Sequence, residues 1–200
     1  LTLPSGTCVL VDTSTDLRAQ ALANGISRVD AIVFTHSHAD HIFGFDEIRR
    51  FNVLAGRPLP VHADARTLDD LRRTFSYAFT TLEQVGGGVP QVEPHEVTGP
   101  FAIDGQRFVP VPILHGRPPI LGYRAGGFAY LTDCSAIPEE SERLLEGVDV
   151  LVLSALRHRP HATHFTLSEA VAAATRIGAR RTWFTHMCHD LGHEATTSAL

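Results

Sequence analysis

The 200-residue sequence predicts a layered α/β fold from three observations. Short runs of β-branched and aromatic residues alternate with segments of helical pattern along the whole chain. No internal repeat or low-complexity tract interrupts this alternation. Several of the runs end directly in histidine or aspartate. Because mixed strands and helices pack as sheets covered by helices, we expect the functional loops to gather at strand ends.

The N-terminal half of the chain alternates predicted strands with predicted helices. Its clearest strand contains a continuous apolar run at residues 31–34, bounded by polar residues. The helix before it ends at Asn24-Gly25, a pair typical of helix C-caps. The predicted strands span residues 7–11, 28–35 and 59–63, the predicted helices span 16–23, 43–51 and 65–75, and the glycines at 86–88 predict a loop.

The C-terminal half contains more strands. The segment 125–127 joins two of them into a hairpin. Thr166 and Glu169 form a capping box, in which each side chain accepts from the backbone amide of the other residue. The predicted strands span residues 101–114, 120–124, 128–132, 148–154 and 181–185, and the predicted helices span 138–146 and 167–177.

The composition is that of a globular protein, with 44% hydrophobic and 20% charged residues. A net charge of −5 argues against broad electrostatic capture of nucleic acid. All 17 basic residues are arginines, so a protein anchor for a phosphate must be Arg, His or backbone. No apolar run approaches the ~18–20 residues that span a bilayer, which excludes a transmembrane protein.

The cysteines at positions 8, 134 and 188 show no C-x-x-C spacing. An odd number of cysteines without such spacing argues against a disulfide framework and for a reducing compartment. The first residues form neither the basic nor the apolar region of a signal peptide. We therefore expect a cytoplasmic protein.

A dense cluster follows the clearest predicted strand: residues 36–41 read His-Ser-His-Ala-Asp-His. Imidazoles this close repel one another when protonated, whereas a divalent cation makes them and the carboxylate joint ligands. A loop held only by hydrogen bonds is the alternative. His115, Asp133 and His186 also end apolar runs, and strand ends of one sheet share a cleft. Together the side chains suffice for two metals with one bridging carboxylate.

The segment Thr-His-Ser-His-Ala-Asp-His after a strand, with His, Asp and His at later strand ends, resembles the metallo-β-lactamase superfamily. The resemblance covers essentially the whole chain. It implies an α/β (α+β) fold, a four-layer αββα sandwich with a dinuclear metal site at one edge of its sheets. It also implies that a hydroxide between the metals is the nucleophile and that Asp40 orients it as a catalytic residue. One metal would be held by His36, His38 and His115, the other by Asp40, His41 and His186, with Asp133 bridging.

Two features distinguish branches of this superfamily. Diiron electron-transfer relatives have Glu at the position of His38, so the histidine favours hydrolysis over redox chemistry. β-Lactamases often have Cys where the bridging Asp lies, and here Cys134 is adjacent to Asp133. Because successive side chains of a strand point to opposite faces, we expect Cys134 to be a core residue.

A second histidine-rich segment lies just before the capped helix. Its His164 resembles the histidine that phosphodiesterase branches, including ribonuclease Z and a phosphoribosyl cyclic phosphodiesterase, have ahead of the last helix. There it implies a general acid for the leaving alkoxide, a role that contributes about 10²–10⁴-fold. A solvated histidine before the helix is the alternative. Arg157 or Arg159 is expected to bind a substrate phosphate, whereas His158 and His161 are expected to be loop residues.

His189 lies three residues beyond His186. Its match in the cyclic phosphodiesterase branch helps to bind a separate structural zinc with cysteines of an N-terminal segment that this sequence does not contain. We expect residues 1–200 to be a single domain that lacks the family's first strand and a short C-terminal piece.

These features favour a dinuclear metal-dependent hydrolase that acts on a small or cyclic phosphodiester. The expected cofactors are two divalent metal ions, Zn²⁺ or Mn²⁺, with iron as an alternative. A thioester or lactone hydrolase, a ribonuclease Z-like tRNA-processing enzyme and a noncatalytic metal-binding module are the other functions considered. The expected partner is a small-molecule phosphodiester, with no membrane and no nucleic acid, and a homodimer stays open.

Overall fold

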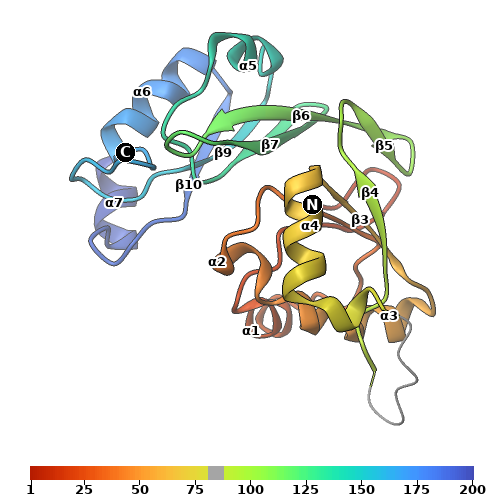
Figure 1. Ribbon diagram of the computed structural model, residues 1–200. Coiled ribbons are helices and arrows are strands. Elements are labelled where there is room, and N and C mark those ends of the chain that lie inside the picture. The colour runs from red at the N-terminus through yellow and green to blue at the C-terminus, as the bar shows by residue number, and fades with distance from the viewer. Residues whose placement is uncertain (81–87) are drawn as a thin grey trace. The chain divides into compact units, whose positions relative to one another are not determined.

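The computed structural model describes residues 1–80 and 88–200, and the chain divides into two compact units (Figure 1). The first unit comprises Leu1–Thr98 and Ile103–Gly105, and the second comprises Gly99–Ala102 and Gln106–Leu200. Each contains a β-sheet and helices, which confirms the predicted layered α/β class. The single domain of residues 1–200 stays a prediction.

A parallel sheet in the order β1-β2-β3-β4 forms the basis of the first unit. Parallel strands need long crossover connections, and helices lie in the connections between these strands. The strands are β1 (Val9–Val11), β2 (Ala31–Val33), β3 (Leu59–Ala63) and β4 (Val92–Glu96). The helices are α1 (Leu17–Ala23), α2 (Ala39–Ile42), α3 (Arg49–Ala55) and α4 (Ala65–Thr74), with 3₁₀ turns η1 (Phe45–Ile48) and η2 (Ser76–Ala78).

The core of the first unit forms between this sheet and its helices. Ile32 and Phe34, from the continuous apolar run after residue 30, are fully buried. Leu17 of α1, Phe51 of α3 and Leu71 of α4 belong to the same apolar cluster. The buried strand therefore places the residues that follow it at a fixed position beside the core.

Gly44 allows two segments of the first unit to approach closely. A Cβ atom at this position would lie 2.0 Å from the carbonyl oxygen of Ser14. The Gly44 amide donates to the Thr13 carbonyl at 3.0 Å, and the Thr13 amide donates to the His41 carbonyl at 2.7 Å. The chain just after the histidine cluster thus requires glycine because backbone atoms occupy the space of a side chain.

A six-stranded mixed sheet in the order β10-β9-β8-β7-β6-β5 forms the basis of the second unit. Strands β8, β9 and β10 are parallel, whereas β6, β7 and β8 form antiparallel pairs. The strands are β5 (Phe101–Ile103), β6 (Gln106–Leu114), β7 (Pro119–Ala125), β8 (Phe128–Leu131), β9 (Val150–Ser154) and β10 (Arg181–Thr185). The helices are α5 (Glu139–Leu144), α6 (Leu167–Ile177) and α7 (His193–Ala199).

Helix α6 forms as its sequence predicts. Thr166 and Glu169 make both hydrogen bonds of the capping box, and Gly178 ends the helix with a left-handed φ of 70°. Ala170 and Ala173 are fully buried in the same apolar cluster as Leu151 of β9. The helix therefore covers the parallel part of the sheet in this unit.

The prediction of one strand over residues 101–114 is wrong, because β5 and β6 are separate strands. Asp104 and Gly105 connect them with φ values of 47° and 77°. Two successive residues with positive φ form the two-residue hairpin turn for which Asp-Gly is typical. Apolar residues continue on both sides of this turn, and for that reason the sequence pattern did not predict the turn.

Three further differences concern elements with weak local patterns. Strand β4 was not predicted, because it is largely exposed, contains Pro94 and depends on its pairing with β3. Helix α7 was not predicted, and its buried residue is Thr196. The helix predicted over residues 43–51 is instead the turn η1 followed by α3. Most of the loop predicted at 86–88 lies outside the described residues. No helix in the described parts of the chain is long and apolar enough to cross a membrane.

We expect Gly44→Ala to lower the free energy of unfolding by about 1–3 kcal/mol, because the added methyl group forces backbone atoms apart. Urea unfolding followed by circular dichroism measures the change. Gly99→Ala is the control, since a Cβ atom there meets no atom within 4 Å. Equal stability of the two variants would show that the close approach at residue 44 does not constrain the fold.

Candidate metal centre

The histidine cluster lies where β2 ends and α2 begins. His36 follows the strand, and His38 is the N-cap residue of α2. His36 and His41 are buried with ring centroids 4.2 Å apart, and the ring of His38 lies 4.6 Å from that of His36. The exposed Asp40 has Oδ2 3.4 Å from Nε2 of His41. The first unit therefore brings the four predicted ligands of the cluster together.

A buried carboxylate that the sequence analysis missed orients two of these rings. Asp12 follows β1 directly, and Nδ1 of His41 lies 2.8 Å from Oδ2 of Asp12. The amide and the hydroxyl of Thr35 each donate to Asp12 at 2.8 Å. Because the hydroxyl proton is used in that bond, Oγ1 of Thr35 accepts from Nδ1 of His36 at 3.0 Å. Asp12 thus holds His41 directly and His36 through Thr35.

The environment of Asp12 is unusual for an aspartate. Burial raises its pKa above the ordinary value, and the hydrogen bonds from His41 and Thr35 oppose that rise. Its backbone has a left-handed φ of 59°. The signal that could have identified it is the one used for Asp133, an aspartate directly after an apolar run.

The loop between His36 and His38 is fastened to α4. The hydroxyl of Ser37 donates to the carboxylate of Asp70, which also pairs with Arg73. The hydrogen bond from Ser37, followed by the contacts with Arg73, holds the pKa of Asp70 below its ordinary value. This contact restrains the backbone that positions the two flanking histidines.

The second unit presents its predicted ligands at the ends of three strands. His115 follows β6, Asp133 lies two residues beyond β8, and His186 follows β10. Asp133 and His186 have φ values of 55° and 57°, in the left-handed region that residues other than glycine seldom adopt. Such backbone strain persists only where the surrounding structure holds it, and it is concentrated at functional sites.

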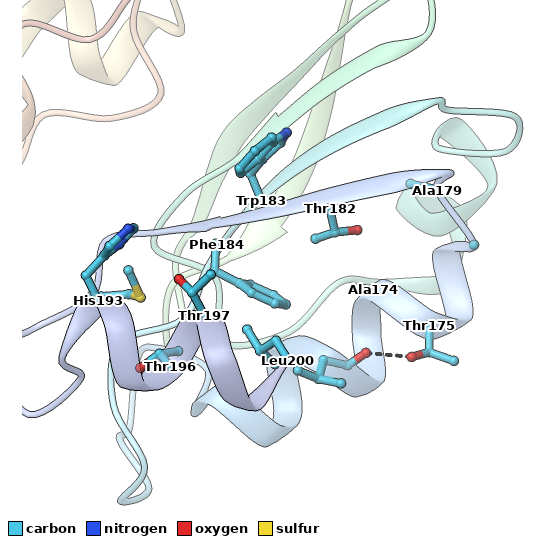
Figure 2. A pocket seen from close by; sticks show the side chains of 13 residues that line it. Ala174, Thr175, Ala179, Thr182, Trp183, Phe184, His193, Thr196, Thr197 and Leu200 are labelled. Carbon is cyan, nitrogen blue, oxygen red and sulfur yellow. Dashed lines mark hydrogen bonds between the residues drawn. The ribbon is translucent and has the colours of Figure 1, made fainter.

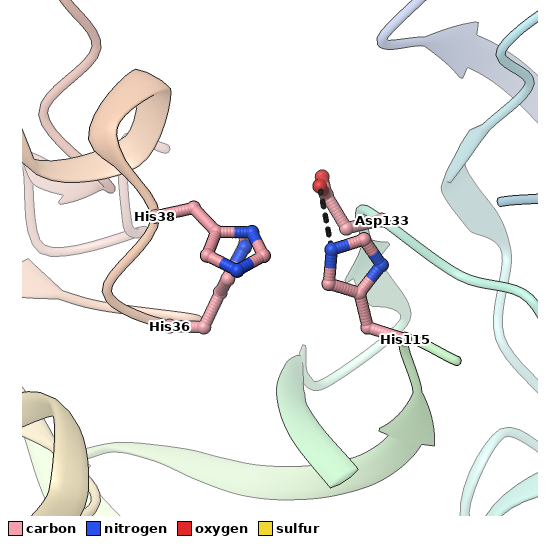
Figure 3. Close-up of side chains that lie close together, drawn as sticks. All are labelled: His36, His38, His115 and Asp133. Carbon is pink, nitrogen blue, oxygen red and sulfur yellow. Dashed lines mark ion pairs between the residues drawn. The ribbon is translucent and has the colours of Figure 1, made fainter. Parts of the chain in front are cut away.

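Asp133 contacts two of the predicted histidine ligands within its own unit. Its Oδ2 lies 3.7 Å from Nε2 of His115, and its Oδ1 lies 3.3 Å from Nε2 of His186. Figure 3 shows the ion pair between Asp133 and His115. The two carboxylate oxygens of Asp133 therefore face different histidines, and its bridging role stays a prediction.

The imidazoles fit a divalent metal ion. Nδ1 of His115 donates to the carbonyl oxygen of Thr163 at 2.8 Å, as Nδ1 of His41 donates to Asp12. These acceptors assign the proton to Nδ1 and the lone pair to Nε2. A hydrogen bond from the second ring nitrogen to a protein acceptor is the usual arrangement for metal-ligating histidine. Imidazole nitrogens with carboxylate oxygens suit zinc, manganese and iron.

His164 lies beside Asp133. Its Nδ1 is buried, lies 4.0 Å from Oδ2 of Asp133 and makes no hydrogen bond within the described residues. Its ring lies 4.6 Å from that of His115 and 5.1 Å from that of His186. Burial lowers the pKa of His164 to about 4, the Asp133 charge opposes this, and the neighbouring histidines add to it. The ring is therefore neutral at neutral pH in the metal-free protein.

The two arginines expected to bind substrate make contacts near their own loop. The guanidinium of Arg157 donates to the carbonyl oxygens of Arg159 and Pro160 at 3.2 and 3.0 Å. Arg159 pairs with Asp190 at 3.0 Å. These contacts brace the loop that leads to His164, and the binding of a phosphate by either arginine stays a prediction.

His189 and Cys134, for which the sequence predicts roles outside the metal centre, lie in different environments. The side chain of His189 is 97% exposed and lies 3.7 Å from Asp190, outside the groups of potential metal ligands found in the described residues. Its role in a structural zinc site stays a prediction. Cys134 is fully buried, as predicted, and burial raises its pKa to about 12.

A cavity of about 580 Å³ in the second unit is a separate feature (Figure 2). It lies among α6, β10 and α7, with Phe184 and the half-exposed Trp183 in its lining. Among the described residues that line it, His193 is the only titratable side chain, and none of the predicted metal ligands is present. This cavity is therefore not the candidate metal centre.

A family model for the beta-lactamase superfamily domain matches residues 7–187. The chain belongs to this superfamily. A crystal structure of a diphosphatase from the PhnP family is 44% identical with a TM-score of 0.89, covering 99% of this chain and 76% of that one. The short form of human tRNase Z is 20% identical with a TM-score of 0.73, covering 92% and 83%, so it shows the fold alone.

One curated relative has a different name. An octanoyltransferase of Porphyromonas gingivalis is 35% identical over 186 residues, which is 92% of this chain. The chain spans 37% of the length of that relative. Membership of the superfamily confirms the predicted metallo-β-lactamase fold with its two sheets and helices. This membership, together with the histidine and aspartate clusters in each unit, supports a metal-dependent hydrolase.

We expect Asp12→Asn to weaken metal binding by about 10–100-fold, because the amide no longer holds His41 and Thr35 as a carboxylate does. Competition with a chromophoric chelator measures the affinity. Asp16→Asn is a matched control, since Asp16 is exposed and its side chain makes no helix-cap hydrogen bond. Equal metal affinity of the two variants would contradict an orienting role for Asp12.

Proposed function

We propose that the protein is a phosphodiesterase that hydrolyses a small or cyclic phosphodiester with two divalent metal ions. Membership of the superfamily and the donor sets within each unit support the ligand assignment. The proposed ligands are His36, His38 and His115 for one ion, Asp40, His41 and His186 for the other, and Asp133 for both.

Bound divalent ions supply Lewis acidity toward the phosphoryl oxygens and lower the pKa of water. Zn²⁺ and Mn²⁺ both suit the donor set, with iron as an alternative. The chain's own contribution is to hold the rings of His36, His41 and His115 each in one tautomer. Asp40, exposed in the first turn of α2, is proposed to accept a hydrogen bond from the attacking water and to orient it.

The position of His164 is the observation that carries the phosphodiesterase proposal. Its buried Nδ1 has no hydrogen-bond partner among the described residues and lies 4.0 Å from the proposed bridging carboxylate. A diester needs a proton on its departing alkoxide, so a donor beside the reacting phosphorus has a defined task. As a hydrogen-bond donor, neutral His164 would stabilise the negative charge that develops on the leaving oxygen, and the proton that this oxygen finally takes would come from solvent.

Relatives favour phosphate chemistry over acyl chemistry. The diphosphatase is 44% identical, and the chain covers 76% of it. A thioester or lactone hydrolase is the second candidate, and the octanoyltransferase is the relative that favours it. The chain covers only 37% of that protein, so its acyl-transfer activity need not belong to the matched part.

Processing of tRNA is less well supported. Arg72 and Arg73 of α4 pair with Asp69 and Asp70, so these arginines do not form a net basic surface. We propose a small-molecule substrate. We also propose a cytoplasmic location, which the free thiols of all three cysteines support. A homodimer stays an untested expectation.

We expect the metal-reconstituted protein to hydrolyse bis(p-nitrophenyl) phosphate and to lose this activity on chelation. His164→Ala should lower kcat by about 10²-fold or more, because the charge developing on the leaving oxygen loses its hydrogen-bond donor. Release of p-nitrophenolate measures the rate, and a thioester substrate is assayed in parallel.

The matched control is His193→Ala, an exposed histidine of α7 that is not a proposed ligand. Turnover of the thioester alone would overturn the phosphodiesterase proposal. Diester turnover unchanged in His164→Ala, with full metal content, would remove the assigned role of His164.

A further inference from the structure

His161 is a second imidazole of the loop before α6, and the proposed reaction does not yet use it. Its ring is exposed, and its centroid lies 5.0 Å from that of His164. The side chain therefore lies next to the proposed donor to the leaving oxygen and is open to solvent.

The hydrogen bonds of His161 assign its tautomer. The amide of Thr163 donates to Nδ1 of His161 at 3.3 Å, and the Thr163 hydroxyl lies 3.2 Å from the same atom. An Nδ1 atom that accepts from a backbone amide carries no proton in the neutral ring. The proton therefore lies on Nε2, and the exposed edge of the ring presents an N–H donor.

Thr163 also ties this imidazole to the candidate metal centre. Its carbonyl oxygen accepts from Nδ1 of His115, so one residue holds both a proposed metal ligand and His161. The contact is tight, because a Cβ atom at Gly116 would lie 2.9 Å from Cγ2 of Thr163. The position of His161 relative to His115 is thus set before substrate binds, which lowers the entropy cost of binding.

Compared with the arginines of this loop, an imidazole is the more suitable hydrogen-bond donor to an anion. The chain contains no lysine. The guanidinium of Arg157 is engaged by backbone carbonyls, and that of Arg159 pairs with Asp190. Both arginines would have to break existing contacts to bind a phosphate, whereas the exposed ring of His161 already has an N–H donor at Nε2.

We propose that His161 is a substrate-binding residue whose Nε2–H donates a hydrogen bond to a non-bridging oxygen of the substrate's phosphate group. This inference rests on the proposed phosphodiesterase function. It gives the two neighbouring imidazoles separate roles: His161 donates a hydrogen bond to the phosphate group, and His164 donates to the leaving oxygen.

Steady-state hydrolysis of bis(p-nitrophenyl) phosphate by the metal-reconstituted protein tests this division. We expect His161→Ala to raise KM about tenfold with kcat nearly unchanged, because the hydrogen bond is present in both ground and transition states. His161→Gln should recover part of the loss, since its amide also offers an N–H donor. His158→Ala, an exposed histidine of the same loop, is the matched control.

Binding of dimethyl phosphate, measured by calorimetry on the same proteins, gives a readout independent of turnover. We expect its affinity to fall about tenfold in His161→Ala and to stay unchanged in His158→Ala. Equal KM and equal dimethyl phosphate affinity in these two variants, at equal metal content, would overturn the proposal. A fall in kcat at unchanged KM would overturn it as well.

The results that would overturn the proposed function differ from those that would overturn the role of His161. If the wild-type protein hydrolyses only the thioester, the phosphodiesterase proposal fails, and the calorimetric comparison still decides whether His161 binds a phosphate oxygen. If the wild-type protein also fails to bind dimethyl phosphate, both proposals fall together.

Discussion

The site depends on the requirement that a metal-ligating imidazole present its Nε2 lone pair in a fixed direction. Hydrogen-bond acceptors of the protein meet this requirement in each unit. Asp12 accepts from His41 directly and controls His36 through the hydroxyl of Thr35, and the Thr163 carbonyl accepts from His115. Each acceptor makes one tautomer favourable, so the rings are oriented before a cation binds. Removing such an acceptor changes the metal site without removing a ligand.

The backbone conformation at the strand ends also helps to set the direction of the side chains there. Asp12, Asp133 and His186 all have left-handed φ values directly after, or close to, the end of a strand. That conformation turns a side chain out of the strand direction, and it costs free energy in residues other than glycine. Surrounding hydrogen bonds hold it in place, such as the one from the Thr35 amide to Asp12. Strain at these positions therefore accompanies the placement of carboxylates and imidazoles at a common edge of each sheet.

The loop before α6 contains both histidines to which we assign roles in the proposed reaction, His161 and His164. Thr163 lies at its centre, with His161 and His164 on either side in the sequence and His115 bound to its carbonyl. In the metal-free protein a low pKa keeps His164 neutral at neutral pH, which suits the N–H donor to the leaving oxygen that we propose. The arginines of this loop brace its backbone. None of the proposed metal ligands lines the cavity beside Trp183, so we assign the proposed reaction to the histidine-rich site instead.

The sequence by itself determined the features that arise from local patterns. These are the buried run of β2, the capping box of α6, the core position of Cys134 and the histidine cluster, because neighbouring residues along the chain carry all their information. Only the tertiary structure revealed the role of Asp12, the turn at Asp104 and the pairing of β4 with β3. The same holds for the donor edge of His161. A carboxylate's partners, a ring's tautomer and an edge strand's register depend on groups brought together by folding, and one local pattern is compatible with many such partners.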